Sequence, residues 1–241
     1  MRNMKKTAQM SESIEIGIIL ALTGGFMDAY SYLCRDHVFA NAQTGNMLLL
    51  GINISEGKWS EALRYLMPVL AFTLGIAIAD IVRVKMDDKN LLHWRQISAL
   101  FEALTLALVS FFSQDMNLLA NSLTSLACGI QVESFRKIRG SGIATTMCIG
   151  NLRNATQNIC EYYHTKDRNA VERGMLYYGI IGCFIIGAVI GNVMIKLFAE
   201  RAILVCTATL FVAFCLMFID KEKSIQTAAA TEEDDTQQID D

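Results

Sequence analysis

Long apolar runs separated by short polar segments dominate the chain. A membrane-spanning helix needs about 20 mostly apolar residues, with about 17 as the lower limit. Six runs meet this length or come close to it: Ile14–Leu33, Tyr65–Val84, Ile97–Phe112, Leu118–Phe135, Met175–Ile195 and Ala202–Ile219. The pattern therefore predicts an all-α integral membrane protein with six transmembrane helices.

Two further segments, Val38–Ile54 and Ile143–Ile159, are only partly apolar. The second contains Arg153 among Thr, Asn and Gln residues, and an arginine costs about 2.5–3.5 kcal/mol at the centre of a membrane helix on insertion scales. Each segment is therefore expected to be interrupted, and either to be sheltered by other helices or to be re-entrant. We expect the turns at Gly45 and Gly150, because glycine adopts backbone conformations that other residues resist.

The distribution of basic residues favours the re-entrant alternative. With Arg153 left uncounted, eight full spans would leave ten Lys and Arg on each side, whereas six spans leave 15 on one side and five on the other. The five are Arg35, Lys58, Arg64, Lys196 and Arg201. Because Lys and Arg accumulate in cytoplasmic loops, we predict six spans with both termini, including residues 1–13, in the cytoplasm.

The two halves of the chain superimpose after a shift of 105 residues without a gap. This shift places Gly24 on Gly129, Asp28 on Glu133, Gly45 on Gly150 and Asn46 on Asn151, and the predicted spans coincide. Three crossings per half give the halves opposite orientations. We therefore predict two inverted repeats, 14–112 and 118–219, an arrangement typical of secondary transporters, whose sites lie where the repeats meet.

Composition agrees with a membrane location and excludes other classes. The chain is 53% hydrophobic and 19% charged, against about 25% charged in soluble domains. The segment Lys221–Asp241 holds seven of the 24 acidic residues and two of the 21 basic ones, which leaves 17 and 19 elsewhere. Nothing here indicates nucleic-acid binding, and residues 220–241 are predicted to be a disordered, acidic cytoplasmic tail.

Seven cysteines and three histidines show no metal-ligand spacing, and no pattern of catalytic residues indicates an enzyme. We expect no metal and no cofactor.

Intramembrane acids are functional candidates by default. Asp28 and Glu133 lie in apolar helices and would approach each other from opposite sides of the midplane. The alternative is structural pairing with Arg35 and Arg136, the latter three residues after Glu133. Asp80 is expected near the cytoplasmic interface, whereas Glu102 lies deeper in its span.

The interrupted segments supply further candidates for a substrate or ion site. A break at Thr44–Asn46 would start a short helix at Met47, whose N-terminus carries a partial positive charge. Arg153 either pairs with Glu161 or contacts an anionic substrate. The small and polar residues could instead serve helix packing, as expected for Gly187 and Gly191. The candidate residues are Asp28, Asn41, Thr44, Gly45, Asn46, Gln131, Glu133, Thr145, Thr146, Gly150, Asn151 and Arg153.

The sequence resembles a known family. The residues Gly25-Phe-Met-Asp28-Ala29, Val38-Phe-Ala-Asn41 and Thr44-Gly-Asn46 resemble the YoaK family of uncharacterised bacterial membrane proteins. Gly129-Ile-Gln131, Ala144-Thr-Thr146 and Gly150-Asn151 agree in the second half, and the resemblance covers about residues 16–219. It implies a bacterial inner-membrane protein and brings no activity with it.

The leading functional hypothesis is a small-solute transporter or channel-like permease with its site between the repeats. The alternative is a non-transporting membrane sensor or assembly module. The expected partners are the lipid bilayer and an unidentified small solute or ion, and homo-oligomerisation stays open.

Overall fold

The computed structural model describes residues 13–86, 94–138 and 141–218, and in these ranges the regular elements are helices. They are α1 (Ile14–Cys34), α2 (Gln43–Ser55), α3 (Trp59–Lys85), α4 (Trp94–Val109), η2 (Gln114–Met116), α5 (Asn117–Ser134), α6 (Cys148–Thr165), α7 (Arg168–Phe198), η3 (Ala199–Ile203) and a last helix, residues 204–218. The all-helical prediction is confirmed for these ranges. The predicted acidic tail, 220–241, and nearly all of the predicted cytoplasmic N-terminus, 1–13, lie outside them.

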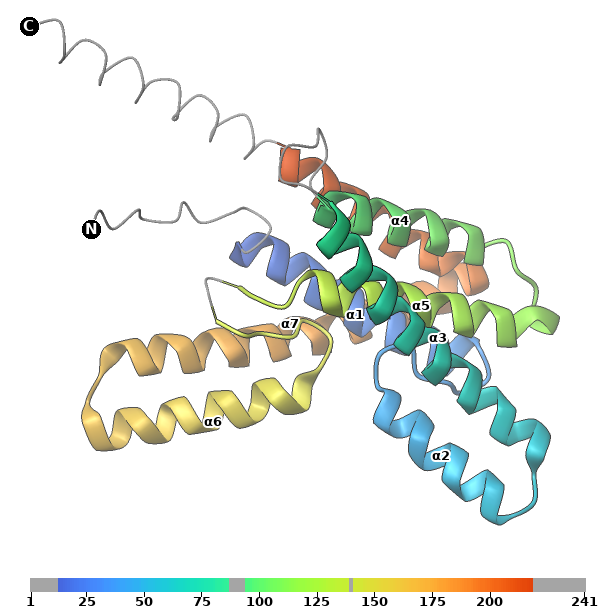
Figure 1. The fold of residues 1–241 in the computed structure, drawn as a ribbon, viewed down its shortest axis with the longest axis horizontal. Helices are drawn as coiled ribbons and strands as arrows, with labels where there is room; N and C mark the ends of the chain where they lie inside the picture. Colours follow the sequence, from blue (N-terminus) through green and yellow to red (C-terminus); the bar gives the residue numbers. More distant parts are fainter. Residues whose placement is uncertain (1–12, 87–93, 139–140, 219–241) are drawn as a thin grey trace, which may run out of the picture.

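Three helical stretches are long and apolar enough to cross a membrane: Ile14–Cys34, Trp59–Lys85 and Arg168–Phe218. The third is divided at η3, where Ala199 has a positive φ of 48°. Figure 1 shows that the chain reverses there, so that α7 and residues 204–218 run in opposite directions. Apolar helices of this length make the protein a helical membrane protein.

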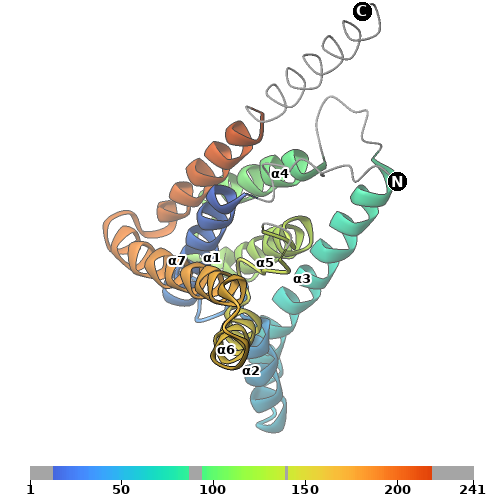
Figure 2. The same ribbon diagram turned by 90° about the vertical axis from the view of Figure 1, so that its left-hand side faces the viewer.

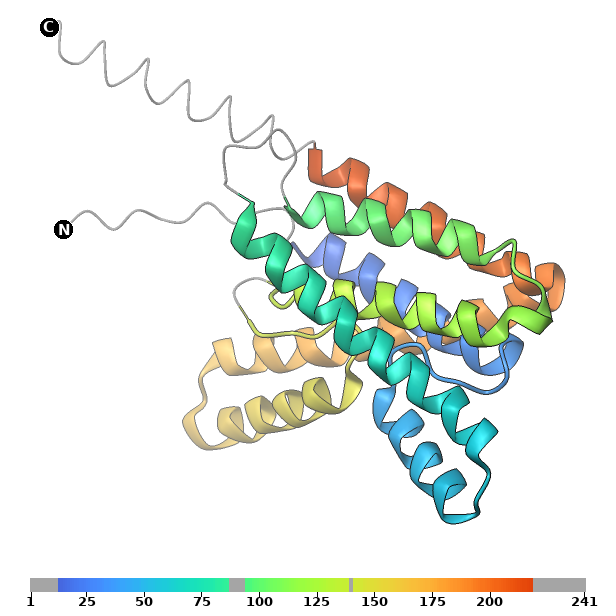
Figure 3. The same cartoon turned by 45° about the vertical axis from the view of Figure 1, so that its right-hand side comes forward.

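Two helical hairpins extend to either side of a central group of helices (Figure 1). One consists of α2 and α3 and the other of α6 and α7, and within each hairpin the two helices pack together. Figure 2 shows α1 and α5 between them, with α7 beside α1 and α3 beside α5. Figure 3 shows α4 and residues 204–218 along the same central group.

Glycines let the central helices approach their neighbours closely. A Cβ atom on Gly25 would collide with the carbonyl of Phe184, and one on Gly187 would collide with the carbonyl of Leu22. A Cβ on Gly191 would lie 3.1 Å from that of Ala29. Helices in membranes pack mainly by such backbone contact, and the packing role predicted for Gly187 and Gly191 is confirmed.

The interrupted segments take a different path from the one predicted. Residues 38–42, the first tip, and 141–147, the second tip, are non-helical, and α2 and α6 begin directly after them near the middle of the molecule (Figure 1). The expected turns at Gly45 and Gly150, and the helix start at Met47, are therefore wrong, because both glycines lie in the first turn of a helix. An extended chain advances about 3.3 Å per residue against 1.5 Å in a helix. A short extended tip thus reaches the interior and leaves the rest of the segment helical.

Candidate functional site

The first tip is held against the middle of α1. Asp28 of α1 accepts hydrogen bonds from the peptide N–H groups of Asn41, at 2.7 Å, and Ala42, at 3.4 Å. The side chain of Asn41 donates to the carbonyl of Gly24 at 3.2 Å. Since Ala42 immediately precedes α2, the Asp28 carboxyl lies at the positive end of that helix. Asp28 therefore has a clear structural role in positioning the tip.

The second tip meets the same part of α1 from another side. Gln131 of α5 donates through Nε2 to the carbonyl of Leu20 and to Thr145 Oγ1, at 3.3 Å each. The methyl group of Thr146 lies against Gly24, where a Cβ atom would approach it to 2.7 Å. Gly24 is thus the point at which the two tips meet, and a larger residue there would separate them.

Three polar atoms at this meeting point have no hydrogen-bond partner in the described part of the chain. They are Asn41 Oδ1, Gln131 Oε1 and Thr146 Oγ1, and all three side chains are buried. A buried polar group without a partner costs about 1–3 kcal/mol. Such groups are rare in native proteins and call for a specific reason. The two tips with these three atoms form the tip junction, our candidate binding site.

The first helical turns after the tips contain residues that hold the tips in shape. Asn46 accepts from the peptide N–H of Phe39 at 3.0 Å and donates to its carbonyl at 2.8 Å. Asn151 donates in the same way to the carbonyl of Ala144 at 2.6 Å. Both carboxamides are buried, whereas Thr44 is exposed. The two asparagines thus fix the shape of the tips, because their side-chain amides form hydrogen bonds with the tip backbone.

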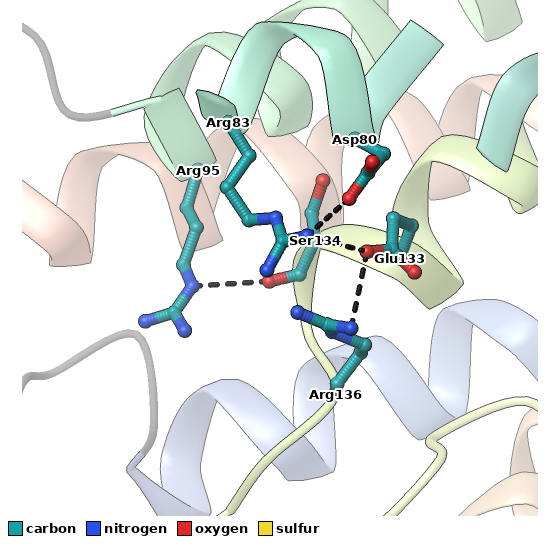
Figure 4. A network of polar contacts seen from close by, with 6 residues as sticks. All are labelled: Asp80, Arg83, Arg95, Glu133, Ser134 and Arg136. Atoms are coloured by element: carbon teal, nitrogen blue, oxygen red, sulfur yellow. Dashed lines mark hydrogen bonds and ion pairs between the residues drawn. The ribbon is translucent and has the colours of Figure 1, made fainter. Parts of the chain in front are cut away.

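Glu133 lies away from the tip junction, so its expected approach to Asp28 is wrong. Figure 4 shows it in a charged cluster where α3 and α5 end. Its carboxylate is 3.3 Å from Arg136 and 4.0 Å from Arg83, and Arg83 also pairs with Asp80. The alternative pairing of Glu133 with Arg136 is confirmed. Close cations satisfy this carboxylate, and sequence spacing alone could not distinguish this position from a central one.

Arg35 does not pair with Asp28 and is not in an exposed loop, although it was counted among the outer basic residues. Arg35 directly follows α1, and its side chain is fully buried against the C-terminal end of α4. All five guanidinium donors are used; the acceptors are Tyr30 Oη, Asn117 Oδ1 and the carbonyls of Val109, Phe112 and Ser113, at 2.9–3.2 Å. The cation thus faces the negative end of the α4 dipole.

Arg153 is exposed on the second turn of α6, and it forms no ion pair among the residues that the structure describes. The pairing expected with Glu161 is therefore wrong, and Arg153 does not contribute to the tip junction. Gly150 is also exposed, with open space where a Cβ atom would stand. The candidate residues from the second half thus divide between the junction and the surface of α6.

Glu102 was left out of the candidate set, yet it is the least satisfied acid in the described ranges. It is fully buried in α4, and neither carboxyl oxygen has a hydrogen-bond partner among residues 13–86, 94–138 and 141–218. The sequence signal was its place inside the apolar run Ile97–Phe112. In the same ranges, no three His, Cys, Asp or Glu residues gather as metal ligands.

Comparison with known proteins gives a family and one curated relative. The model of the family described as "Protein of unknown function (DUF1275)" matches residues 16–216. The "UPF0700 transmembrane protein YoaK" of Bacillus subtilis (strain 168) is 29% identical over 150 residues. The match covers 58% of this chain and 64% of that relative, so the chain spans less than two thirds of the relative's length. No solved structure matches the chain.

Proposed function

The chain belongs to the DUF1275 family of proteins of unknown function, and from that premise we propose that it is a small-solute transporter or channel-like permease of the bacterial cell membrane. The tip junction is the proposed binding site. Its location at the meeting of two interrupted segments, within a helical membrane protein, is the observation that carries the proposal. Non-helical backbone at membrane depth is tolerated only where it is buried in protein or lines a water-filled cavity.

The three atoms without a partner leave hydrogen-bonding groups at the junction that a bound solute could use. Asn41 Oδ1 and Gln131 Oε1 are acceptors, and the Thr146 hydroxyl both donates and accepts. A small polar solute carrying N–H or O–H groups offers the kind of hydrogen-bond partner that these atoms lack. Because these side chains come from the two tips and from α5, a solute there would contact both halves of the chain.

The two halves contact their neighbouring helices through similar residues, which supports the proposed inverted repeat and a site where the repeats meet. The α1–α7 crossing brings Gly25 against Phe184 and Gly187 against Leu22. The α5–α3 crossing brings Gly129 against Phe72 and Gly75 against Leu126. The same residue types therefore occupy corresponding places in the two crossings: Leu22 and Leu126, Gly25 and Gly129, Phe184 and Phe72, and Gly187 and Gly75.

These contacts favour a register that differs from the gapless shift of 105 residues. Leu22 and Leu126 are 104 positions apart, whereas Gly75 and Gly187 are 112 apart. In this register Asp28 corresponds to Val132 and not to Glu133. In Figures 1 and 3, α5 runs opposite to α1, which is the relation that inverted repeats require.

The proposed topology has six crossings: α1, α3, α4, α5, α7 and residues 204–218. The α2 helix, of 13 residues, is about 20 Å long at 1.5 Å per residue. Starting from the interior, it reaches one membrane surface and does not cross a core about 30 Å thick. The first tip is then re-entrant, and we propose the same path for the second because α6 carries the exposed Arg153. With the basic residues distributed as above, both termini are cytoplasmic.

A sensor or assembly module is the second candidate, and the surface of α6 favours it. Arg153, Thr156 and Gln157 are exposed along this helix, and a lipid-facing surface of that polarity is costly. A partner protein or a second copy that covers α6 would remove this cost. Cross-linking from a cysteine at position 157 in membranes would detect such a partner.

Flux through reconstituted full-length protein tests transport. Vesicles with and without protein are loaded with buffer and exposed to glycerol, urea, alanine, glucose and acetate in turn, and swelling is followed by light scattering. Faster entry of at least one compound than in protein-free vesicles is expected. No acceleration for any compound, with the protein folded and correctly inserted, counts against transport.

A matched pair of variants then locates the site. Thr146→Val removes the unpartnered hydroxyl at the junction and keeps the side-chain shape. Thr73→Val makes the same change on an exposed turn of α3. We expect the first variant to change the rate or the concentration dependence of entry and the second to leave both unchanged. Equal flux in both variants would remove the junction from the path.

A further inference from the structure

Glu102 sits on the buried face of α4, where the neighbouring hydroxyls of Ser98 and Thr105 donate to carbonyls of the same helix. Ala99, Ala103 and Leu106 lie on the same helical face and belong to the central apolar core. Neither carboxyl oxygen accepts or donates a hydrogen bond within the described ranges. The other two acids considered as site residues are satisfied, Asp28 by peptide N–H groups and Glu133 by arginines.

An ionised carboxylate is not stable in these surroundings. Moving a charge out of water costs several kcal/mol even after the protein relaxes, unless a counter-ion or hydrogen bonds compensate. Two described cations flank Glu102 along α4: Arg95, seven residues before it, donates to the carbonyl of Ser134, and Arg35 donates to the carbonyl of Val109. Val109 is seven residues from Glu102, about 10 Å along the helix axis, and the Arg35 donors are all used. Glu102 in this conformation therefore carries a proton.

The titratable groups that face Glu102 connect it with the tip junction. Cys128 of α5 lies within electrostatic reach of both Glu102 and Asp28, and Cys206 in the last helix lies within reach of Glu102. Tyr30 of α1 belongs to the same buried cluster. Asp28 in turn bonds the first tip. Cys128 thus lies within electrostatic reach of Glu102 on one side and, on the other, of the acid that holds the first tip.

We propose that Glu102 binds a proton in this protein and that this proton is the coupling ion. The second part, coupling, rests on the proposed transport function. When the tip junction opens to water, the O–H bond of the carboxyl breaks and the proton passes to a water molecule, which leaves a carboxylate. Re-protonation from the other side of the membrane restores the buried acid. Solute movement and proton movement are then coupled through the opening of the junction.

Infrared spectroscopy of the full chain in lipid tests the first part. The wild type should show the carbonyl band of an un-ionised carboxyl at neutral pH, which Glu102→Gln lacks. Glu161→Gln, the same change at an exposed position of α6, should keep the band. Transfer to D₂O should shift the band, because an exchangeable proton is replaced by deuterium. An unaltered band in Glu102→Gln, or a band that never shifts, would overturn the proposal.

Glu102→Gln also keeps the size of the side chain, so it should fold. Should it fail to fold, modification of the wild type gives the same information. A hydrophobic carbodiimide reacts with protonated carboxyls, so mass spectrometry should find Glu102 labelled, with labelling that decreases as pH rises. Failure to label Glu102 at any pH, in digests that recover the Glu102 peptide, would contradict the proposal that Glu102 is protonated.

Proton coupling is tested separately from solute flux. Vesicles containing a pH-sensitive dye are exposed to the compound that entered fastest among glycerol, urea, alanine, glucose and acetate. Wild-type protein should change the internal pH as the compound enters, and Glu102→Gln should lose this change. Entry without any pH change would reject coupling and leave the transporter assignment intact. A labelled, exchangeable Glu102 in a protein that moves none of the five compounds would reject coupling together with the transporter assignment.

Discussion

Replacing Arg35 should destabilise the protein more than replacing any surface arginine. The Arg35→Met variant keeps an unbranched apolar stem in place of the arginine stem and removes five hydrogen bonds at once. Three backbone carbonyls at the end of α4 then lose their donor in a buried place. Asn117 Oδ1 loses its donor from Arg35 as well.

The magnitude follows from the kind of bond that is lost. Hydrogen bonds to a charged group contribute about 1.5–3 kcal/mol each, but members of one network do not add. Breaking a buried charged network typically costs about 3–5 kcal/mol. Arg35→Lys keeps the charge with three donors in place of the planar fork of five, so we expect it to lose about 2 kcal/mol.

The control is Arg136→Met, because Arg136 is half-exposed and its partner Glu133, although largely buried, keeps Arg83 as a second cation at 4.0 Å. Exposed ion pairs contribute about 0–1 kcal/mol. Unfolding of the three purified variants in mixed micelles, titrated with dodecyl sulfate and followed by circular dichroism, gives the free energies. Equal stability of Arg35→Met and Arg136→Met would show that the carbonyls of α4 find other donors, and the assigned role of Arg35 would be wrong.

Three further predictions concern backbone contacts and the first tip. Gly187→Ala should lower the free energy of unfolding, because its Cβ would collide with the backbone of α1. Gly179→Ala has open space at its Cβ and should raise this free energy by up to about 1 kcal/mol, because alanine has the higher helix propensity. The same micelle titration measures both variants. Gly150→Ala should be tolerated for the same reason, and Gly45→Ala should cost more because its Cβ would approach the Phe39 ring to 2.8 Å; equal melting temperatures would contradict this. Asp28→Ala should cost about 1–3 kcal/mol by leaving buried peptide N–H groups without an acceptor, and Asp28→Asn should cost less, which thermal unfolding of both variants checks.

The apolar runs determined where the helices lie. A lipid environment accepts only segments whose backbone groups bond internally, so runs of about 20 apolar residues must be helical whatever surrounds them. The predicted span Ile14–Leu33 differs from α1 by one residue. The polar interruptions before Gln43 and Cys148 likewise marked the interruptions in the structure, although the turns lie a few residues before the glycines.

Only the tertiary structure decided which polar residues share a site. Asp28 and Glu133 have the same chemistry and similar apolar neighbours in sequence, yet one bonds a tip and the other pairs with arginines at the end of α5. Arg35 and Arg153 differ in the same way, since one is buried with five acceptors and the other is exposed.

The physical reason is the range of the interactions. Helix formation depends on local hydrophobicity, which the sequence displays directly. The partners of a buried polar group come from segments about 80 residues away, as with Arg35 and Asn117, and depend on how closely the helices cross. Glu102 shows the limit most clearly. Its place in an apolar run was visible in the sequence, whereas its lack of a hydrogen-bond partner among the described residues became evident only when α5 and the last helix were packed around it.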